Sequence, residues 1–276
     1  MSYVTALIPP QAPPPGPAVR YTAARFVGNV AMGVWLALSI GIFLMIVDGW
    51  DPEKFARYGP SYLSGLAVTL TLVILSVVLG GLLSLPLAFA RMSRNPALSW
   101  LAYTYVYFFR GTPLLTQLFL VYYGLGSFSN ELKAVGLWWF FRDAWNCALL
   151  TFTLNTAAYQ AEILRGAIQS VPRGQREGAA ALGIPPRIAF LKIILPQAMI
   201  VALRPYGNEI ILMIKGSAIV AIVTVFDLMG ETRRAFSRTF DYQTYLWAAL
   251  MYLVMVEALR NLWAWLEAHL TRHLKR

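Results

Sequence analysis

The side chains that could do chemistry in this chain are polar and charged residues that interrupt long apolar stretches. Arg204, Asn208 and Lys215 are spaced i, i+4 and i+11, which places them on one stripe of a helix. Glu209 lies about 100° further round the same helix. Because a charged stripe cannot face lipid, it must face a cavity, a partner subunit or an ion-pair network. Glu209 and Lys215 carry the two charges needed to hold a zwitterion, although structural ion pairing also accounts for them.

A second apolar stretch carries Asn155 and Thr156 near its middle. Polar groups at that depth are functional candidates, and hydrogen bonding between helices is the structural alternative. Glu162 and Arg165 lie near the end of this stretch, where charged residues commonly sit at the membrane interface or hold a loop. The candidate substrate-binding residues are therefore Asn155, Asn208, Glu209, Lys215 and Ser217.

No motif of a catalytic or nucleotide-binding site is present in the sequence. The chain lacks a G-x-x-x-x-G-K-[ST] loop, an H-E-x-x-H pair and a G-x-S-x-G turn. His269 and His273 have the i, i+4 spacing of metal ligands, but no third ligand is evident, so we interpret them as surface or interfacial residues. We expect no catalytic residue, no metal site and no cofactor bound by this chain.

The composition indicates which elements must position these side chains. The chain has 276 residues, of which 58% are hydrophobic and 13% charged, against roughly a quarter charged in a soluble domain. Several uncharged windows approach the ~20 residues of a bilayer-spanning helix, which predicts an all-α polytopic membrane protein. The net charge of +10 then reflects membrane topology rather than nucleic-acid binding. A single cysteine, Cys147, excludes an internal disulfide.

Six membrane-spanning helices are predicted. They cover residues 27–47, 62–90, 98–125, 145–168, 198–226 and 245–266. A Pro-rich, extended tail precedes the first helix. The third helix is interrupted by RGTP (110–113), where Thr112 followed by Pro113 predicts a helix start. Arg110 beside them suits the headgroup region, and no substrate role is assigned to it.

The distribution of basic residues predicts the orientation. Six spans place both termini and the loops 91–97 and 165–197 on one side. Thirteen Lys and Arg residues fall on that side against seven on the other, which makes it the cytoplasmic side. The loop 230–245 is basic although it is external. It either tolerates its charges as a late loop or provides a docking surface for an acidic external partner.

The predicted second span has small residues on one stripe. Ser76, Gly80, Ser84 and Ala88 recur at i, i+4 intervals. Small side chains let helix backbones approach closely in lipid, so this stripe predicts a helix-packing face, which could also face a second subunit.

The long loop between the fourth and fifth spans predicts a helix–turn–helix on the cytoplasmic side. Residues 177–182 favour a helix, with Glu177 in its first turn, and Gly183 follows where a helix end needs a left-handed residue. Pro185 and Pro186 then suit the start of a new helix, and Pro196 marks the start of the fifth span. The alanine-rich first helix presents little bulk and could fit a groove on another protein.

This loop resembles the EAA loop of ABC importer permeases, whose pattern is E-A-A-x3-G-x9-I-x-L-P. Glu177, Ala179, Gly183 and "IILP" (193–196) match it, and Gly178 replaces the second-position alanine. Segments 108–124, 154–179 and 206–215 resemble the polar amino acid branch of these permeases, and 206–215 is most similar to the histidine, cationic amino acid and opine members. Where related permeases read KDTSL, this chain reads KGSAI, so Gly216 supplies no substrate-binding acid and Ser217 only a hydroxyl.

The resemblance implies a five-helix type I ABC importer permease core plus one extra N-terminal transmembrane helix. It implies import of a polar amino acid, or a derivative such as an opine, delivered by a periplasmic binding protein in the bacterial inner membrane. A second permease subunit and an ABC ATPase dimer complete the transporter, and the ATPase uses ATP and Mg. The residues implied in ATPase coupling are Glu177, Gly178, Ala179, Ala180, Ala181, Leu182 and Gly183.

The predicted organisation has four parts. They are a Pro-rich cytoplasmic tail (1–26), the additional helix (27–47), the permease domain (62–268) with its coupling loop at 177–196, and a basic cytoplasmic tail (269–276). An ion-gradient-driven secondary transporter is the alternative, but it would need no cytoplasmic loop for an ATPase, and no inverted repeat is evident. An intramembrane enzyme would need a nucleophile–base or metal-ligand set that the sequence lacks.

Overall fold

The computed structural model describes residues 22–272, and the chain divides into two units. The first unit, Met1–Trp50, contains the helix α1 (Ala23–Asp48), which Thr22 caps by accepting a hydrogen bond from the Arg25 amide at 3.4 Å. The predicted Pro-rich stretch and the last four residues of the basic tail lie outside the described residues. α1 confirms a long apolar helix at the predicted position.

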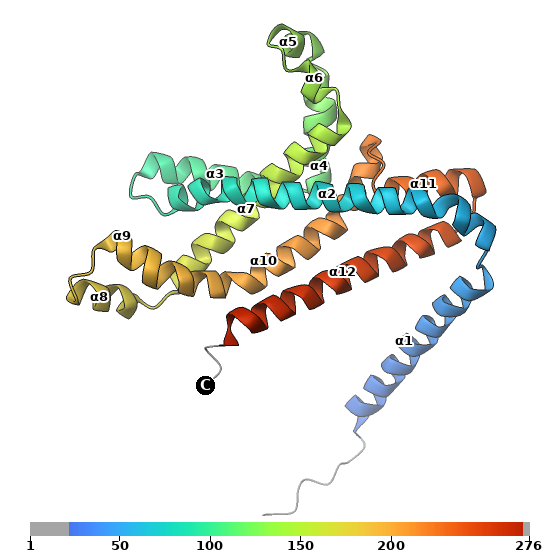
Figure 1. The fold of residues 1–276 in the computed structure, drawn as a ribbon, viewed down its shortest axis with the longest axis horizontal. Coiled ribbons are helices and arrows are strands. Elements are labelled where there is room, and N and C mark those ends of the chain that lie inside the picture. The colour runs from blue at the N-terminus through green and yellow to red at the C-terminus, as the bar shows by residue number, and fades with distance from the viewer. Residues whose placement is uncertain (1–21, 273–276) are drawn as a thin grey trace, which may run out of the picture. The chain divides into compact units, whose positions relative to one another are not determined.

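The second unit, Asp51–Arg276, is built from helices throughout its described part, which confirms the all-α fold (Figure 1). The longer helices are α2 (Pro52–Arg91), α3 (Pro96–Gly111), α7 (Ala144–Ser170), α8 (Arg173–Ala181), α10 (Leu195–Ser217), α11 (Leu228–Thr239) and α12 (Gln243–Leu270). Shorter ones are α4 (Leu114–Phe119), α5 (Ser129–Ala134), α6 (Trp138–Phe141), α9 (Pro186–Ala189), the π-helices η1 (Leu120–Gly124) and η2 (Phe190–Ile194), and the 3-10 helix η3 (Ala218–Val223).

Four helical segments among residues 22–272 are long and apolar enough to cross a membrane. They are Ala23–Asp48, Pro52–Arg91, Pro186–Val223 and Gln243–Leu270. α7 has 27 residues, and it carries more buried residues than any other described helix. The predicted spans at 145–168 and 98–125 fall on α7 and on α3 to η1, so the total of six spans stays a prediction.

Two span boundaries differ from the sequence prediction. α2 begins at Pro52 rather than near Tyr62, because Asp51 caps the helix and Pro52 occupies its first position. The predicted third span is two helices: α3 ends at Gly111, and α4 starts after Pro113 in a different direction (Figure 1). Pro113, rather than Thr112, is the N-cap of α4.

α7 packs most extensively against α2. Ser76, Gly80, Ser84 and Ala88 are all buried, which confirms the predicted packing stripe. A side chain at Gly80 would collide with Thr156 of α7, so the stripe brings the two backbones together within one chain.

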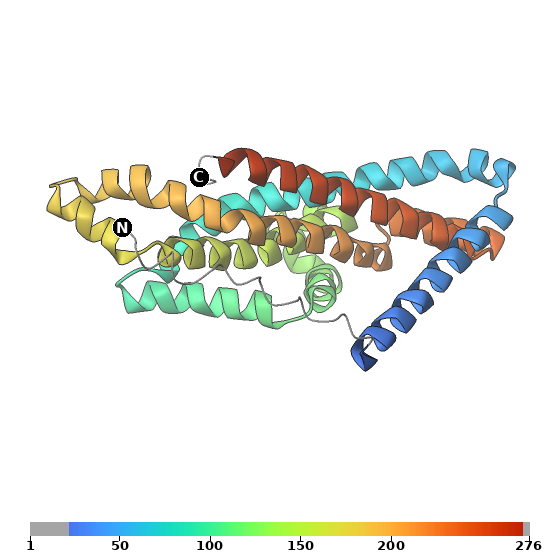
Figure 2. The same cartoon turned by 90° about the horizontal axis from the view of Figure 1, so that it is seen from below.

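The second unit has two distinguishable ends (Figures 1 and 2). The connection from α2 to α3, the α8–α9 elbow and the C-terminal part of α12 lie toward one, which we call the elbow end. α11 and the first turns of α2 and α12 lie toward the other, the α11 end. The loops that the sequence assigns to one side of the membrane thus lie toward the same end of the unit.

Candidate functional site

The α8–α9 elbow connects α7 to α10. α7 ends at Ser170 because Val171 is extended before Pro172, and Pro172 then serves as the N-cap of α8. α8 therefore begins at Arg173, and the expectation that Glu177 lies in a first helical turn is wrong. Glu177 lies in the middle of α8, and its side chain is exposed.

The turn of the elbow forms as the glycine and proline pattern predicts. Gly183 adopts a φ of 69°, the left-handed conformation that closes a helix. The Gly183 amide donates to the Ala180 carbonyl at 3.0 Å, and the Ile184 amide donates to the Ala179 carbonyl at 2.9 Å. These two bonds make a Schellman motif, and α9 starts directly afterwards at Pro186.

The elbow exposes apolar side chains. Ala179 and Ala189 are buried, so they belong to its inner side. Leu182 is 79% exposed, and Ile188 and Leu191 are also exposed. Three exposed aliphatic side chains on a short polar connection are typical of a surface that another protein covers.

Glu209 belongs to a buried polar network between α10, α7 and α2. Thr156 donates through Oγ1 to the Glu209 carboxylate at 3.1 Å. Gln160 donates through Nε2 to Thr156 Oγ1 at 3.1 Å and to the Val77 carbonyl at 3.0 Å. Both the predicted acid on α10 and the Thr156 hydroxyl therefore lie in one site.

Asn155 lies in a different network that holds the break between α3 and α4. Asn155 donates through Nδ2 to Gln117 Oε1 at 2.9 Å and to the Phe109 carbonyl at 3.0 Å. Gln117 donates in turn to the Phe109 and Thr112 carbonyls, at 2.9 and 3.1 Å. Asn155 thus satisfies backbone groups that the interrupted helix leaves free.

The other predicted residues of α10 are dispersed. Asn208 and Lys215 are exposed, whereas Ser217 is buried and donates to the Ile214 carbonyl of its own helix at 2.7 Å. Arg204 pairs with Glu267 of α12 at 2.6 Å. The structure therefore uses one end of the charged stripe for an ion pair between helices.

Glu162 is the centre of a charged cluster that the sequence analysis did not predict. Its carboxylate accepts hydrogen bonds from Arg91 Nε at 3.1 Å and from Arg165 Nη2 at 2.7 Å. Arg110 Nη1 lies 4.0 Å from the same carboxylate. These residues come from α2, α3 and α7, and their separation in sequence gave no signal of proximity.

A pocket of 340 Å³ opens beside this cluster. Its lining comprises Arg91, Tyr103, Val106, Tyr107, Arg110, Gly111, Tyr159 and Glu162. The Arg91 guanidinium lies over the Tyr103 ring at 4.8 Å, and the Arg110 guanidinium lies over the Tyr159 ring at 5.1 Å. We call it the arginine pocket.

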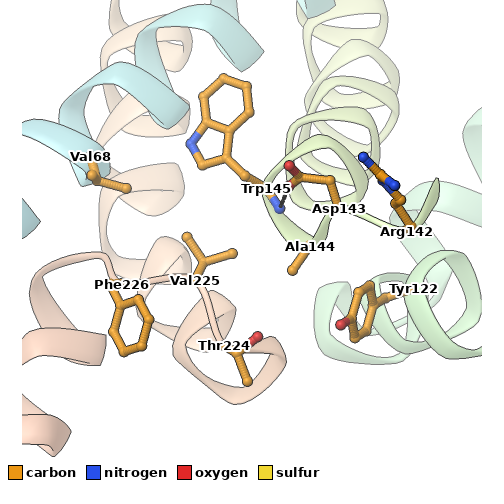
Figure 3. A pocket seen from close by; sticks show the side chains of 9 residues that line it. All are labelled: Val68, Tyr122, Arg142, Asp143, Ala144, Trp145, Thr224, Val225 and Phe226. Atoms are coloured by element: carbon orange, nitrogen blue, oxygen red, sulfur yellow. Dashed lines mark hydrogen bonds between the residues drawn. The ribbon is translucent and has the colours of Figure 1, made fainter. Parts of the chain in front are cut away.

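A second pocket, of 530 Å³, is formed by α2, η1, the start of α7 and the turn after η3 (Figure 3). Tyr122, Trp145 and Phe226 supply aromatic groups, and Arg142 and Asp143 supply charges. Asp143 accepts the Trp145 amide at 2.8 Å, so its carboxylate caps α7.

Known proteins that are similar to this chain are permease components of transport systems. The family profile described as "binding-protein-dependent transport system inner membrane component" matches residues 80–275. The chain is 41% identical over 226 residues to the nopaline transport system permease protein NocM of Agrobacterium fabrum, covering 80% of this chain and 93% of the relative. It is 40% identical over 213 residues to the histidine/lysine/arginine/ornithine permease protein HisM of Escherichia coli, covering 77% and 90%.

Solved structures agree. An amino acid ABC transporter crystallised with histidines matches with a TM-score of 0.70 and 35% identity, covering 80% of this chain and 99% of that one. The MetNI methionine transporter in an inward-facing conformation matches with a TM-score of 0.65 at 17% identity, a likeness of fold alone.

Proposed function

The chain belongs to the binding-protein-dependent transport system inner membrane components, the permease subunits of ABC importers, and on this premise we propose that it carries a polar amino acid or a derivative such as an opine. The relatives named for nopaline and for histidine, lysine, arginine and ornithine support this substrate class. The structural observation that supports the role as an importer subunit is the α8–α9 elbow, which has a glycine-closed turn and exposed aliphatic residues on a helical membrane scaffold.

We further propose that an ATPase dimer binds the elbow. The residues assigned to this contact are Glu177, Gly178, Ala179, Ala180, Ala181, Leu182 and Gly183, with buried Ala179 supporting the others. ATP and Mg are used by that partner, and this chain binds neither. The elbow end then faces the cytoplasm, and the charge distribution of the sequence favours the same side of the membrane for both termini. A second permease subunit, identical or similar, completes the membrane part.

The external binding protein would dock at the α11 end. α11 carries Arg233, Arg234 and Arg238 with exposed side chains. Positive charge there would steer an acidic face of the binding protein onto the permease.

We assign the substrate to polar residues of α10, one of them buried. Glu209 offers a carboxylate for an ammonium group, while Asn208 and Lys215 are exposed on the same helix. Asn155 and Ser217 bond within the chain, so we assign them a supporting rather than a direct role.

Reconstitution tests the proposed function. The permease is placed in liposomes with its partner ATPase and binding protein, and uptake of L-histidine, L-arginine, octopine and nopaline is measured. Uptake that requires internal ATP and the ATPase is expected. Uptake driven by an ion gradient after ATP depletion would instead favour a secondary transporter.

Variants of the elbow test the ATPase contact. Gly183→Asp places a negative charge at the C-terminal end of α8, where the helix dipole disfavours it, and Glu177→Lys reverses a charge on the exposed helix. Both should therefore abolish co-purification of the ATPase while the permease stays in the membrane. Gly183→Asn is the matched control, because asparagine tolerates this conformation. Unchanged co-purification in the first two variants would contradict the assignment.

A further inference from the structure

The arginine pocket contains a cation whose charge is poorly compensated. The Arg110 side chain is 44% exposed, and its Nη1 is 4.0 Å from Glu162, too far for a hydrogen bond. No hydrogen bond within residues 22–272 engages its guanidinium, which lies over the Tyr159 ring. Its N–H donors therefore point to a missing partner.

Glu162 cannot be that partner, because its two oxygens are already used. Oε1 accepts from Arg91 at 3.1 Å and from Arg165 at 3.0 Å, and Oε2 accepts from Arg165 at 2.7 and 3.0 Å. Three guanidinium groups thus share one carboxylate. Within an otherwise apolar helical scaffold, such an excess of positive charge favours binding of an anion.

The lining of the pocket suits a planar anion on a small organic molecule. A guanidinium presents a planar fork of N–H donors that binds a carboxylate bidentately. Tyr103, Tyr107 and Tyr159 add aromatic surface around it. Tyr103, Tyr107 and Arg110 follow one another at i, i+4 and i+7, so one face of α3 presents all three.

An acid for the substrate's ammonium group is available on another helix. The Glu209 carboxylate on α10 is buried, and it accepts a hydrogen bond from Thr156 of α7, the helix that also carries Tyr159 and Glu162 of the pocket. A cation on α3 and an acid on α10 provide the two charges that an amino acid needs. Lys215, the cation that the sequence offered, is exposed.

We propose that the arginine pocket binds a carboxylate of the transported substrate, with Arg110 as its cationic anchor. The proposal rests on the function proposed above, because it requires a carboxylate-bearing substrate. It assigns a specificity role to a residue that the sequence explained as an interfacial anchor.

The test compares an amino acid with its amide in the complete reconstituted importer. The measured quantity is uptake of L-arginine or L-histidine, whichever the wild type imports. The unlabelled acid and its amide, L-argininamide or L-histidinamide, are added as competitors. Arg110→Gln should raise KM for the acid about tenfold and leave inhibition by the amide unchanged, since the amide lacks the charged partner. The acid-to-amide preference should therefore fall toward one.

Arg110→Lys and Arg94→Gln complete the design. Lysine keeps the charge but not the fork, so Arg110→Lys should retain part of the preference, and it carries the test if Arg110→Gln does not assemble. Arg94 is exposed outside the pocket, and Arg94→Gln should behave as the wild type.

Three results would overturn the proposal. They are an unchanged preference, an equal rise in KM for acid and amide, and an activity of Arg110→Gln that depends instead on anionic lipid. The first excludes contact with the carboxylate, the second assigns Arg110 to helix packing, and the third assigns the pocket to a lipid phosphate. If the wild type imports none of the four substrates of the reconstitution assay, the proposed function itself is contradicted. This result is obtained first, before the acid-to-amide preference is measured.

Discussion

Gly178 lies in the interior of α8, where a glycine weakens a helix. A Cβ added at this position would meet nothing within 4 Å. Gly178→Ala should therefore stabilise α8 by about 0.5–1 kcal/mol, measured as slower hydrogen exchange of the α8 amides. Weaker binding of the ATPase by this variant would show instead that the partner's surface has no room for the added methyl group.

Asp241 links the connection between α11 and α12 to the start of α2. Its carboxylate accepts a hydrogen bond from Lys54 at 2.8 Å, and this bond, with one from the Gln243 amide, lowers the pKa of Asp241 below its ordinary value. Because the folded-state pKa is lowered, the pairing stabilises the fold above the unfolded-state pKa of about 4 and is lost as the pH falls through the folded-state value.

Thermal unfolding of the purified chain measures this pairing. The wild type should lose stability below about pH 4, and Asp241→Asn should lose less over the same range. An identical pH dependence in both proteins would mean that the pair does not contribute.

Single residues also show what the sequence could predict. Gly183, Pro185 and Pro186 act through their own backbone preferences, so the elbow turn could be predicted from the sequence and is confirmed. The position of Arg110 beside Glu162 depends on how α3 packs on α7, which no local pattern encodes. The role of Asn155 at the α3–α4 break could not be predicted either, because it also depends on the packing of α3 on α7.

At the scale of helices, the small-residue stripe of α2 packs this helix against α7. A methyl group at Gly80 would meet Thr156, the residue that donates to Glu209. Gly80→Ala should destabilise the fold by about 1–3 kcal/mol and disturb the Glu209 network.

The measurement is the thermal unfolding temperature of the purified protein. Gly166→Ala, an open position on α7, is the control and should leave the temperature unchanged or raise it. An unaltered transition in Gly80→Ala would show that the two helices can separate at little cost.

Helix positions were largely predictable from the apolar runs, whereas the exact start of α2 was not. Asp51 caps α2 and Pro52 occupies its first position, well before the predicted start of the span near Tyr62. The sequence predicted an interruption at RGTP, but Asn155 of α7, which stabilises the break between α3 and α4, lies far away in the chain. The early start of α8 was not predicted, and it follows from Pro172.

At the scale of the whole molecule, the permease unit has its own core. Its buried cluster draws on residues from Tyr58 to Met255, and relatives cover about 80% of the chain. A chain lacking residues 1–50 should therefore insert and import substrate when assembled with its partners, as measured by ATP-dependent uptake. Loss of membrane insertion in the shortened chain would make α1 part of the folding unit.

The π-helix η2, between the elbow and α10, has a geometric consequence. A π-helical turn holds one residue more than the α-helical bonding pattern, so η2 offsets the angular phase of the elbow from that of α10. Deleting one residue from Phe190–Ile194 would restore α-helical pitch and rotate the elbow by about 100° relative to the face that bears Glu209. If the elbow transmits ATP hydrolysis as proposed, the five residues of η2 would thus set the direction in which movement of the elbow reaches the helix face that bears Glu209.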